Sequence, residues 1–399
     1  MRDDVPVKSE PEKDSEKDRG PHQVATPEDQ VPGATRAAGI KDVATLAGVS
    51  LKTVTNVVHE RPNVAAETRA RVQAAIAELG YRPSMAGRQL QSGRSNVITL
   101  AVPRIDEPYL GALAHAMIAA ARPLGYALLV DETGGRPDRE ALAAAGYPGH
   151  SIDGVIFEAL DAHHLAELSR INPTVLLGER IAGTTADHVG IDNVASARDV
   201  VAHLVATGRR SIGFLGHQGH TQTSVPSLRY RGFREAVHDA GLDTAADWHV
   251  PTGQYTREEG EARTEAALSD LASADALVCV SDLLAIGAMR ALARRGIRVP
   301  QDIAVVGWDD TVDAAYHHPT LTSVAPDLRQ LAERTIALLV ERIEGRRDLG
   351  QAHVVPHRLV VRESSAPASG RDPGRQDAVP PPSTRSSLHP TTTAQRSVR

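Results

Sequence analysis

The stretch from residue 40 to residue 59, IKDVATLAGVSLKTVTNVVH, constrains the local fold more tightly than any other part of this 399-residue chain. On either side of Gly48, small and apolar residues recur three and four positions apart, which is the spacing that places side chains on one face of a helix. Glycine tolerates the positive φ of a sharp turn, and Ser50 is placed to cap a second helix. The expected inward-facing residues are Val43, Ala44, Ala47, Val54 and Val57. The pattern predicts two short helices joined by a tight turn.

Polar side chains lie between the inward-facing positions of the second expected helix. The expected outward-facing residues are Lys52, Thr53, Thr55 and Asn56. Two short helices with a glycine turn and a polar outer face on the second are typical of a helix-turn-helix, and residues 66–80 predict a third helix that ends at Gly80. Residues 39–95 hold eight basic and four acidic side chains, a local charge of +4 in a chain whose net charge is −6. Shape and charge together predict DNA binding.

Downstream of Asn96, strand-length apolar runs alternate with alanine-rich helical stretches. The runs include VITLAVP, YALLVDE, DGVIFEA, TVLLGE, VGIDN, SIGFLG, ALVCVS and IAVVGWDD. Continuous apolar strands that alternate with helices indicate parallel sheets covered on both faces. Roughly 270 residues exceed one ordinary domain of this kind, so two doubly wound α/β subdomains are predicted. Ligands of such folds bind beyond the carboxyl ends of the strands or between the lobes.

The composition of the chain argues against disulfide bonds, cysteine metal clusters and membrane spans, and it indicates disordered tails. The only cysteine, Cys279, lies in an apolar run, so neither a disulfide framework nor a cysteine metal cluster is expected. No run approaches the roughly 18 apolar residues of a membrane span, and the acidic N-terminus lacks an apolar signal region. Residues 1–38 and 364–399 are polar and proline-bearing, and are expected to be disordered. The chain is predicted to be soluble and cytoplasmic, associated with the nucleoid and without a membrane partner.

Several motifs resemble one known family. IKDVATLAGVSLKTVTNVV, ETRARVQAAIAELGYRP and RQLQSGRS closely resemble the DNA-binding headpiece of the lactose-repressor (LacI/GalR) family of bacterial transcription regulators. HVGIDN, RYRGFREA, SDLLAIGAMRAL, GIRVPQDIAVVGWDD and PTLTSVAPD are similar to that family's sugar-binding core. The resemblance covers about residues 39–363. It implies a homodimer, a pseudo-palindromic double-stranded DNA operator, and control of operator binding by a small-molecule effector in a periplasmic-binding-protein-like core.

The resemblance also implies a domain organisation. It identifies residues 39–83 as an all-α helix-turn-helix DNA-binding domain and residues 84–95 as a hinge helix and linker. Residues 96–363 would form an effector-binding and dimerisation core of two subdomains, between which the chain crosses. In the hinge, Leu90 matches the residue that wedges into the minor groove at the operator centre. A helix this short is unstable by itself. The hinge is therefore expected to fold only when it pairs with the hinge of the other subunit on DNA.

The base-reading positions of the family fall on the second helix of the helix-turn-helix. They correspond to Lys52, Thr53, Thr55, Asn56 and His59. Asn56 stands where arginine is frequent, and His59 stands where asparagine is frequent. Arginine pairs bidentately with guanine, whereas asparagine suits adenine or a mixed contact. The preferred half-site is therefore expected to differ from the usual one.

Polar residues at the predicted strand ends are the candidates for effector contact. From the residues alone, the candidates are Asp192, Ser281, Asp282, Asp309, Asp310 and Arg229. Asp282 opens a helix and is expected to be an N-cap rather than a ligand contact, and Asp310 is equally consistent with a structural role. The resemblance implies that Asp309 and Arg229 hydrogen-bond effector hydroxyls, with Asp192 and Ser281 beside them.

The resemblance further implies that Tyr109 and Tyr255 pack on a sugar or base ring. A carboxylate and a guanidinium beside aromatic faces suit a neutral polyol, so a sugar is the expected effector. Within transcription regulation, repression is favoured by analogy. An activator, or a corepressor-dependent regulator that responds to a nucleoside or another metabolite, is the alternative. The disordered tail has no leucine heptads, which favours a dimer over a coiled-coil tetramer.

An enzyme is the main rival class. The chain contains no G-x-x-x-x-G-K-[ST] loop, H-E-x-x-H element or G-x-S-x-G elbow, so no catalytic residue and no cofactor are predicted. The pairs His217/His220 and His317/His318 lie in expected loops, where exposure to solvent is more common than metal binding. No metal site is therefore predicted.

Overall fold

The computed structural model describes residues 38–59, 61–81, 93–146, 151–158, 170–178, 184–217, 224–242, 249–347 and 350–366. The chain divides into two units, Met1–Gly87 and Arg88–Arg399. Leu90, most of the predicted hinge and nearly all of both predicted tails lie outside the described residues.

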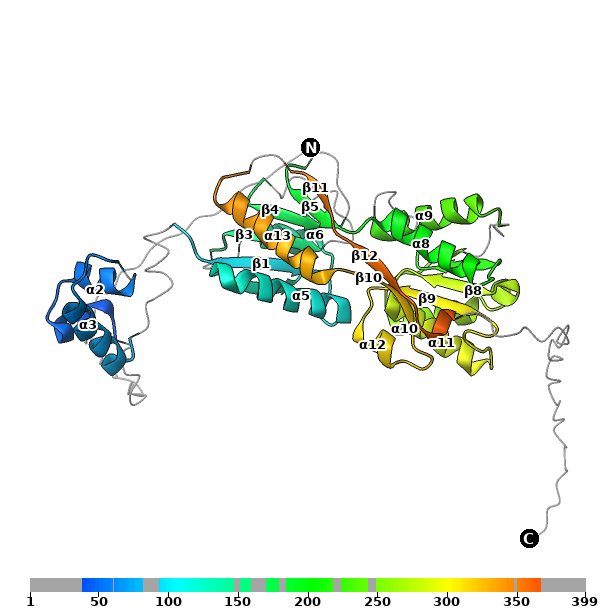
Figure 1. The fold of residues 1–399 in the computed structure, drawn as a ribbon, viewed down its shortest axis with the longest axis horizontal. Helices are drawn as coiled ribbons and strands as arrows, with labels where there is room; N and C mark the ends of the chain where they lie inside the picture. Colours follow the sequence, from blue (N-terminus) through cyan, green and yellow to red (C-terminus); the bar gives the residue numbers. More distant parts are fainter. Residues whose placement is uncertain are drawn as a thin grey trace, which may run out of the picture. The chain divides into compact units, whose positions relative to one another are not determined.

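Three helices make up the described part of the first unit (Figure 1). They are α1 (Ile40–Ala47), α2 (Leu51–Val58) and α3 (Ala66–Leu79). Gly48 ends α1 with a φ of 63° and a ψ of 39°. The Ser50 side chain accepts a hydrogen bond from the Thr53 N–H at 3.2 Å and so caps α2. The predicted turn and cap are confirmed.

Small apolar side chains form the core of this helical unit. The buried residues are Val43, Ala44, Ala47, Val54, Val57, Val72 and Ala75. Ile76 and Leu79 of α3 are half-buried against them. At the start of α3, Ala65 supplies no side-chain cap. The core occupies one side of α2 and leaves the polar side of that helix accessible.

The second unit contains two six-stranded sheets. The N-terminal subdomain has the strand order β11-β5-β4-β3-β1-β2 with parallel pairing throughout. Its strands are β1 (Val97–Val102), β2 (Ala127–Glu132), β3 (Gly154–Glu158), β4 (Thr174–Leu177), β5 (Asp187–Gly190) and β11 (Ala352–Val354). Its helices are α5 (Pro108–Ala121), α6 (Pro137–Ala145) and α13 (Leu328–Ile343), with the short 3₁₀ helix η1 (Arg122–Leu124). Helix α13 packs on α5 and on β3–β5, and α6 contacts β1 and β3.

The C-terminal subdomain has the strand order β12-β10-β9-β8-β6-β7, and only β12 among these strands runs antiparallel to its neighbour. The strands are β6 (Ile212–Leu215), β7 (His249–Val250), β8 (Ala276–Cys279), β9 (Ala304–Trp308), β10 (Thr322–Pro326) and β12 (His357–Val360). The helices are α8 (Asn193–Ala206), α9 (Val225–Asp239), α10 (Arg257–Ala266), α11 (Asp282–Arg294), α12 (Val312–Tyr316), η2 (Asp270–Ser273) and η3 (Glu363–Ser365). Helix α8 packs with α9, and α10 packs with α11 on the other side of the sheet (Figure 1).

Four strands were not predicted from the apolar pattern. β7, β11 and β12 are two to four residues long and partly exposed, so they form no continuous apolar run. β10 is buried but begins with polar residues, and these are satisfied by hydrogen bonds. Thr322 Oγ1 donates to the Arg362 carbonyl at 3.1 Å, and Ser323 Oγ donates to Asp282 Oδ1 at 2.6 Å. Tertiary hydrogen bonding therefore places polar residues in a buried strand.

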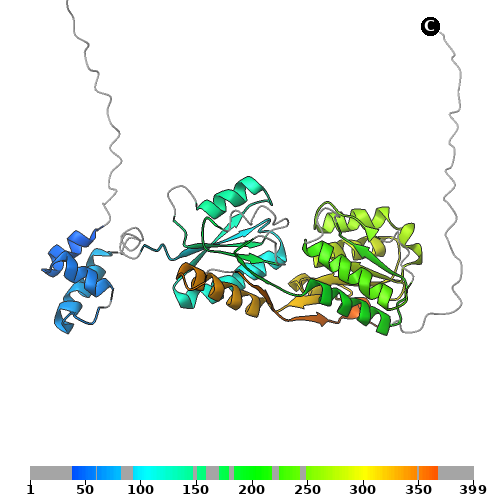
Figure 2. The ribbon, with the colours of Figure 1, turned by 90° about the horizontal axis from the view of Figure 1, so that it is seen from above.

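The described chain passes between the two subdomains three times (Figure 2). It crosses from β5 to α8, from β10 to α13 and from β11 to β12. Hydrogen bonds join the crossing segments: the Val355 N–H donates to the Gly190 carbonyl at 2.8 Å, and the Asp327 N–H donates to the Pro356 carbonyl at 3.0 Å. The carboxyl ends of strands from both sheets meet beside these crossings, where the candidate ligand site lies.

Candidate functional site

The outer side of α2 carries the residues expected to read bases. Lys52 and His59 are exposed, whereas Thr53, Thr55 and Asn56 are half-buried. Both threonine hydroxyls already make local hydrogen bonds: Thr55 Oγ1 donates to the Leu51 carbonyl at 3.0 Å, and Thr53 Oγ1 lies 2.9 Å from Ser50 Oγ. The longer polar groups of Lys52, Asn56 and His59 are therefore the better candidates for contact with base edges.

A cavity of about 340 Å³ lies between the two subdomains. The N-terminal subdomain contributes Pro103, Glu107, Tyr109, Leu110, Glu158, Leu177, Gly178 and Gly190. The C-terminal subdomain contributes Asn193, Ser224, Val225, Pro226, Arg229, Tyr255, Val280, Ser281 and Asp309. The volume falls at the lower end of the range for small-molecule sites, which suits a ligand of monosaccharide or nucleoside size.

Arg229, on α9, is held by contacts to several other elements. Its Nε donates to Asn193 Oδ1 at 2.9 Å, and its Nη1 donates to the Val280 carbonyl. The same guanidinium lies 3.9 Å from Asp309 Oδ1 and 5.2 Å from the centre of the Trp308 ring. Its side chain is only 12% exposed, and burial lowers the pKa of Arg229, although arginine stays charged in proteins. Arg229 is therefore a pre-positioned cation at the edge of the cavity.

Asp309 follows β9 in an unusual backbone conformation. Its φ is 103°, a region that residues other than glycine rarely adopt, and its N–H donates to the Val324 carbonyl at 2.9 Å. Strain of this kind concentrates at ligand sites. Burial raises the pKa of Asp309 to about 6, while the charge of Arg229 acts in the opposite direction. Above that pH the carboxylate is ionised and accepts hydrogen bonds from ligand hydroxyls.

The expectation that Asp282 caps α11 is wrong. Ser281 has an extended backbone, with φ −148° and ψ 160°, and its Oγ accepts a hydrogen bond from the Leu284 N–H at 3.3 Å. Asp282 is instead the first helical residue, and it is buried. It accepts hydrogen bonds from the Thr311 N–H at 2.7 Å and from Ser323 Oγ at 2.6 Å. Asp282 therefore joins α11 to the strand and loop beside it.

The cavity includes most of the other predicted effector contacts. Tyr109, Tyr255 and Ser281 line it together with Arg229 and Asp309, whereas Asp192 does not. Asp192 is exposed and caps α8 by accepting a hydrogen bond from the Ala195 N–H at 2.8 Å. The next residue, Asn193, lines the cavity in its place. Asp310 pairs with Arg362 at 2.6 Å, which is a structural role.

Two glutamates that were not predicted also line the cavity. Glu158 is the last residue of β3, and Glu107 directly precedes α5. Burial raises the pKa of each to about 7, and the charge of Asp309 adds to the effect in both. The rule that indicated Asp309, a polar residue at the carboxyl end of an apolar strand, also applies to Glu158. The loop position of Glu107 gives no comparable indication.

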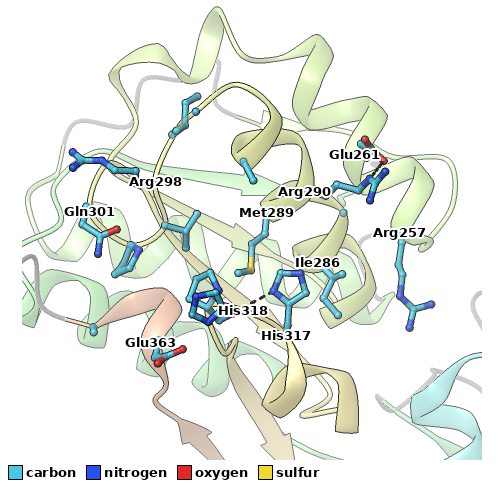
Figure 3. Close-up of a pocket in the computed structure, with 18 of the residues that line it drawn as sticks. Arg257, Glu261, Ile286, Met289, Arg290, Arg298, Gln301, His317, His318 and Glu363 are labelled. Atoms are coloured by element: carbon cyan, nitrogen blue, oxygen red, sulfur yellow. Dashed lines mark hydrogen bonds and ion pairs between the residues drawn. The ribbon is translucent and has the colours of Figure 1, made fainter.

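A larger depression of about 1150 Å³ lies on the C-terminal subdomain, beside α10 and α11 (Figure 3). Two of its arginines already have acidic partners, since Arg290 lies 3.0 Å from Glu261 and Arg298 lies 2.6 Å from Asp302. The Arg290 side chain is 68% exposed. A ligand in this depression would contact one subdomain only, whereas a ligand in the cleft would contact both. This difference favours the cleft as the effector site.

Within the part of the chain that the structure describes, no group of three or more histidine, cysteine or carboxylate side chains could hold a metal ion. His217 Nδ1 lies 3.2 Å from His249 Nε2, and the His217 ring stacks on Tyr230. His220 lies outside the described residues. No helix within those same ranges is long and apolar enough to cross a membrane.

The helix-turn-helix and the cleft define a class of protein with a DNA-binding headpiece and a two-lobed ligand-binding core. Residues 39–84 match the family described as bacterial regulatory proteins, lacI family, and residues 201–365 match the periplasmic binding protein-like domain. The HTH-type transcriptional repressor PurR of Serratia proteamaculans (strain 568) is 31% identical over 335 residues, which cover 82% of this chain and 97% of that protein. The HTH-type transcriptional regulator DegA of Bacillus subtilis (strain 168) is 29% identical over 334 residues, covering 82% and 98%. The chain belongs to the LacI family and is a DNA-binding transcriptional regulator.

Solved structures agree with this assignment. The Lac repressor dimer bound to operator and the anti-inducer ONPF has a TM-score of 0.74 and 27% identity, covering 83% of this chain and 100% of that chain. The complex of the transcriptional regulator CelR with cellobiose has a TM-score of 0.61 and 29% identity, covering 82% and 99%. The predicted fold class, an all-α headpiece with an α/β core of two parallel-sheet subdomains, is confirmed. These relatives are transcriptional regulators rather than enzymes.

Proposed function

We propose that this regulator is a repressor that binds a pseudo-palindromic operator as a homodimer and changes its operator affinity when a small hydroxylated molecule, such as a sugar, occupies the cleft. The observation that carries the proposal is the cavity between the subdomains, lined by Arg229 and Asp309 from one side. A charged donor and a charged acceptor 3.9 Å apart can engage neighbouring hydroxyls of one ligand. Tyr109 and Tyr255 offer flat faces for a ring.

The position of the cavity supports effector control. A ligand shifts a conformational equilibrium only through contacts that differ between the two states. A molecule that contacts Glu158 on one side and Arg229 on the other favours those arrangements of the subdomains in which both contacts form. The names of the relatives support the direction of control: PurR is a repressor, the Lac repressor structure holds an operator and an anti-inducer, and CelR holds cellobiose.

Base reading by α2 is tested by selecting binding sites from random DNA with the full-length protein. The wild type is expected to select two inverted half-sites, one for each subunit. Asn56→Arg is expected to shift one position of each half-site toward guanine, with a discrimination of about 1–3 kcal/mol from a bidentate contact. The measurement is the base frequency at each selected position, followed by Kd values on the two operator sequences.

A matched control separates base reading from added charge. Gln73→Arg adds the same charge at an exposed position of α3. It is expected to strengthen binding to all sequences and to leave the preferred base unchanged, because phosphate attraction carries no sequence information. An unchanged base preference in Asn56→Arg would contradict the role assigned to Asn56.

Effector control is tested by a thermal-shift screen of mono- and disaccharides and nucleosides, with operator affinity then measured for each hit. Release from the operator supports a sugar-responsive repressor, and tighter operator binding would identify a corepressor. If no stabilising compound changes operator affinity, the proposal of effector control fails. Sedimentation of the free protein tests the dimer, and a monomer on a single half-site would contradict it.

A further inference from the structure

The cleft has an excess of negative charge. Glu107, Glu158 and Asp309 line it, and Arg229 is the only arginine or lysine among the described residues that line it. With all four groups ionised, three carboxylates and one guanidinium give a charge of −2 in a largely buried space. Buried charges without partners are costly, and empty sites respond by shifting their pKa values. A neutral ligand would leave that imbalance in place.

The excess is concentrated on one side. The Glu158 side chain makes no hydrogen bond or ion pair with any described residue, although its atoms line the cavity. For Glu107 the nearest cation is Arg104, with Nε 4.0 Å from Oε1. Arg104 is already committed to Asp106, since its Nε and Nη2 donate to the two carboxylate oxygens at 3.0 Å and 2.7 Å. The two glutamates therefore lack a strong cationic partner within the described structure.

The geometry points to an effector that carries a protonated amine on a hydroxylated ring or chain, with the ammonium group held by Glu158 and Glu107 and the hydroxyls held by Arg229 and Asp309. This inference rests on the proposed function, because it names the class of molecule that would act at the cleft. A cavity of about 340 Å³ has room for an aminated monosaccharide or polyol. The faces of Tyr109 and Tyr255 are compatible with both a ring and a cation.

Anionic and neutral ligands fit this arrangement less well. An anion would approach Arg229 but would also meet three carboxylates. A neutral polyol would satisfy Arg229 and Asp309 and would leave Glu158 without a partner. An ammonium group reduces the charge of the cleft from −2 to −1 and supplies up to three donors to carboxylate oxygens. The amine therefore adds a contact that its neutral counterpart cannot make.

The same arrangement makes binding depend on pH. Burial raises the pKa of both Glu107 and Glu158 to about 7, with Asp309, Arg104, Asp106 and Arg229 as the other charged groups that act on them. A bound cation favours the ionised carboxylates, so binding releases protons and becomes tighter as the pH rises from 6 to 8. A neutral ligand does not need the two glutamates to be ionised, so its binding is not expected to release protons in this way.

The test compares pairs of compounds that differ only in the amine. The pairs are 6-amino-6-deoxyglucose with glucose, 6-amino-6-deoxygalactose with galactose, and 1-amino-1-deoxysorbitol with sorbitol, since these amines stay protonated through pH 8. Titration calorimetry with the full-length protein at pH 6, 7 and 8, in two buffers of different ionisation enthalpy, gives Kd and proton release. At least one amine is expected to bind at least tenfold more tightly than its partner and to release protons.

Variants assign the effect to the two glutamates. Glu158→Gln keeps the side-chain shape and is expected to weaken amine binding at least tenfold and to flatten its pH dependence. Glu107→Gln is expected to have a smaller effect, because Arg104 already offsets part of that charge. Glu265→Gln, on α10 and paired with Arg295, removes the same charge outside the cavity and is expected to leave amine binding unchanged. Thermal unfolding of each variant shows whether it is folded.

The outcomes separate this inference from the proposed function. The inference of an amine-bearing effector is overturned if the neutral compounds bind as tightly as the corresponding amines. It is also overturned if no amine in the panel binds. Amine binding that is insensitive to both Glu158→Gln and Glu107→Gln also overturns it, because the amine is then held elsewhere. The proposed function stands in each of these cases if any cleft ligand, such as a neutral sugar, changes operator affinity. Effector control, the part of the proposed function on which this inference rests, fails when no ligand changes operator affinity.

Discussion

The two sides of the effector cleft carry different kinds of charge. The C-terminal side presents Arg229 and Asp309, an oppositely charged pair 3.9 Å apart whose guanidinium is held by two further hydrogen bonds. The N-terminal side presents Glu107 and Glu158, two acids whose pKa values burial raises to about 7. One side is pre-positioned and keeps its charge near neutral pH. The ionisation of the other side depends on pH and on the occupant of the cleft.

The two sides also act on one another. The charge of Asp309 contributes to the raised pKa of both glutamates, and the charge of Arg229 opposes that effect at Glu158. These groups belong to different subdomains, so any change in the separation of the subdomains changes the ionisation of the glutamates. Ligand charge and subdomain arrangement are therefore linked through the side chains of Glu107, Glu158, Arg229 and Asp309. The C-terminal side, which is pre-positioned, is suited to hydroxyl recognition. The N-terminal side, called the adjustable side because its ionisation changes with pH and ligand, is suited to charge recognition.

Removal of the pre-positioned cation should have the largest effect. Arg229→Ala leaves three carboxylates in the cleft with no arginine or lysine among its described lining residues. The expected cost is about 3 kcal/mol, typical for breaking a buried ion pair, which corresponds to a fall in Tm of roughly 5–10 °C. The variant is also expected to lose its response to effector. Thermal unfolding at pH 7.5 and operator binding with and without the screened ligand measure the two effects.

Arg231→Ala is the matched control for that prediction. Arg231 lies two residues further along α9, is 57% exposed, and has its Nε 3.8 Å from Glu235. Exposed pairs of this kind contribute little, so a change below about 0.5 kcal/mol and a normal effector response are expected. Equal losses in the two variants would show that Arg229 has no special role in the cleft.

The two glutamates of the adjustable side should make the stability of the protein depend on pH. The folded-state pKa values of Glu107 and Glu158 lie near 7, above the ordinary value of 4.5. The stability contributed by the protonated acids is therefore fully present below about pH 4.5 and is lost as the pH rises to about 7. Each glutamate contributes a slope of at most about 1.4 kcal/mol per pH unit, and Glu107 contributes less because its side chain is 24% exposed. The double variant Glu107→Gln/Glu158→Gln should be more stable than the wild type at pH 8.

The measurement is the difference in unfolding free energy between wild type and double variant from pH 5.5 to pH 8. The difference is needed because burial lowers the pKa of His203, His249 and His353, which gives a slope of opposite sign that both proteins share. The difference should widen in favour of the variant with rising pH. A difference that stays constant would mean that both glutamates remain ionised throughout, and that the two sides of the cleft do not differ as described.

The headpiece and most of the sheets could be predicted because their causes are local. The turn at Gly48 and the cap at Ser50 depend on neighbours within a few residues, and strands such as β3 and β8 are unbroken buried runs. The exceptions have equally clear causes. β10 contains buried polar residues that only tertiary hydrogen bonds explain. Helix α11 is capped by Ser281 rather than by the predicted Asp282, because Ser281 is the residue with the extended backbone.

The cleft could be predicted only in part, because its chemistry depends on residues far apart in the chain. The two tyrosines were reached through a family resemblance alone. Arg229 and Asp309 were candidates from the residues themselves, and the resemblance gave them their expected role. Asn193 replaces Asp192 in the cavity because the Asp192 side chain caps α8. No sequence pattern indicates the raised pKa of Glu158, since that value follows from burial and from a carboxylate on the opposite subdomain. Ionisation is a property of the assembled site.

The smallest expected effect concerns the hydroxyl of Tyr255, on the pre-positioned side. Burial raises the pKa of Tyr255 to about 12, so the phenol stays neutral wherever the glutamates titrate. Tyr255→Phe keeps the ring and removes at most one neutral hydrogen bond, worth about 0.5–1.5 kcal/mol, so a loss of roughly 2–10-fold in effector affinity is expected. Tyr255→Ala also removes the ring face and should weaken binding further. Titration calorimetry of both variants from pH 6 to pH 8 should show curves parallel to that of the wild type, because neither change touches a titrating group. A steeper or flatter curve for Tyr255→Phe would mean that the hydroxyl helps to set the ionisation of the glutamates, and that the two sides of the cleft are not as distinct as their charges indicate.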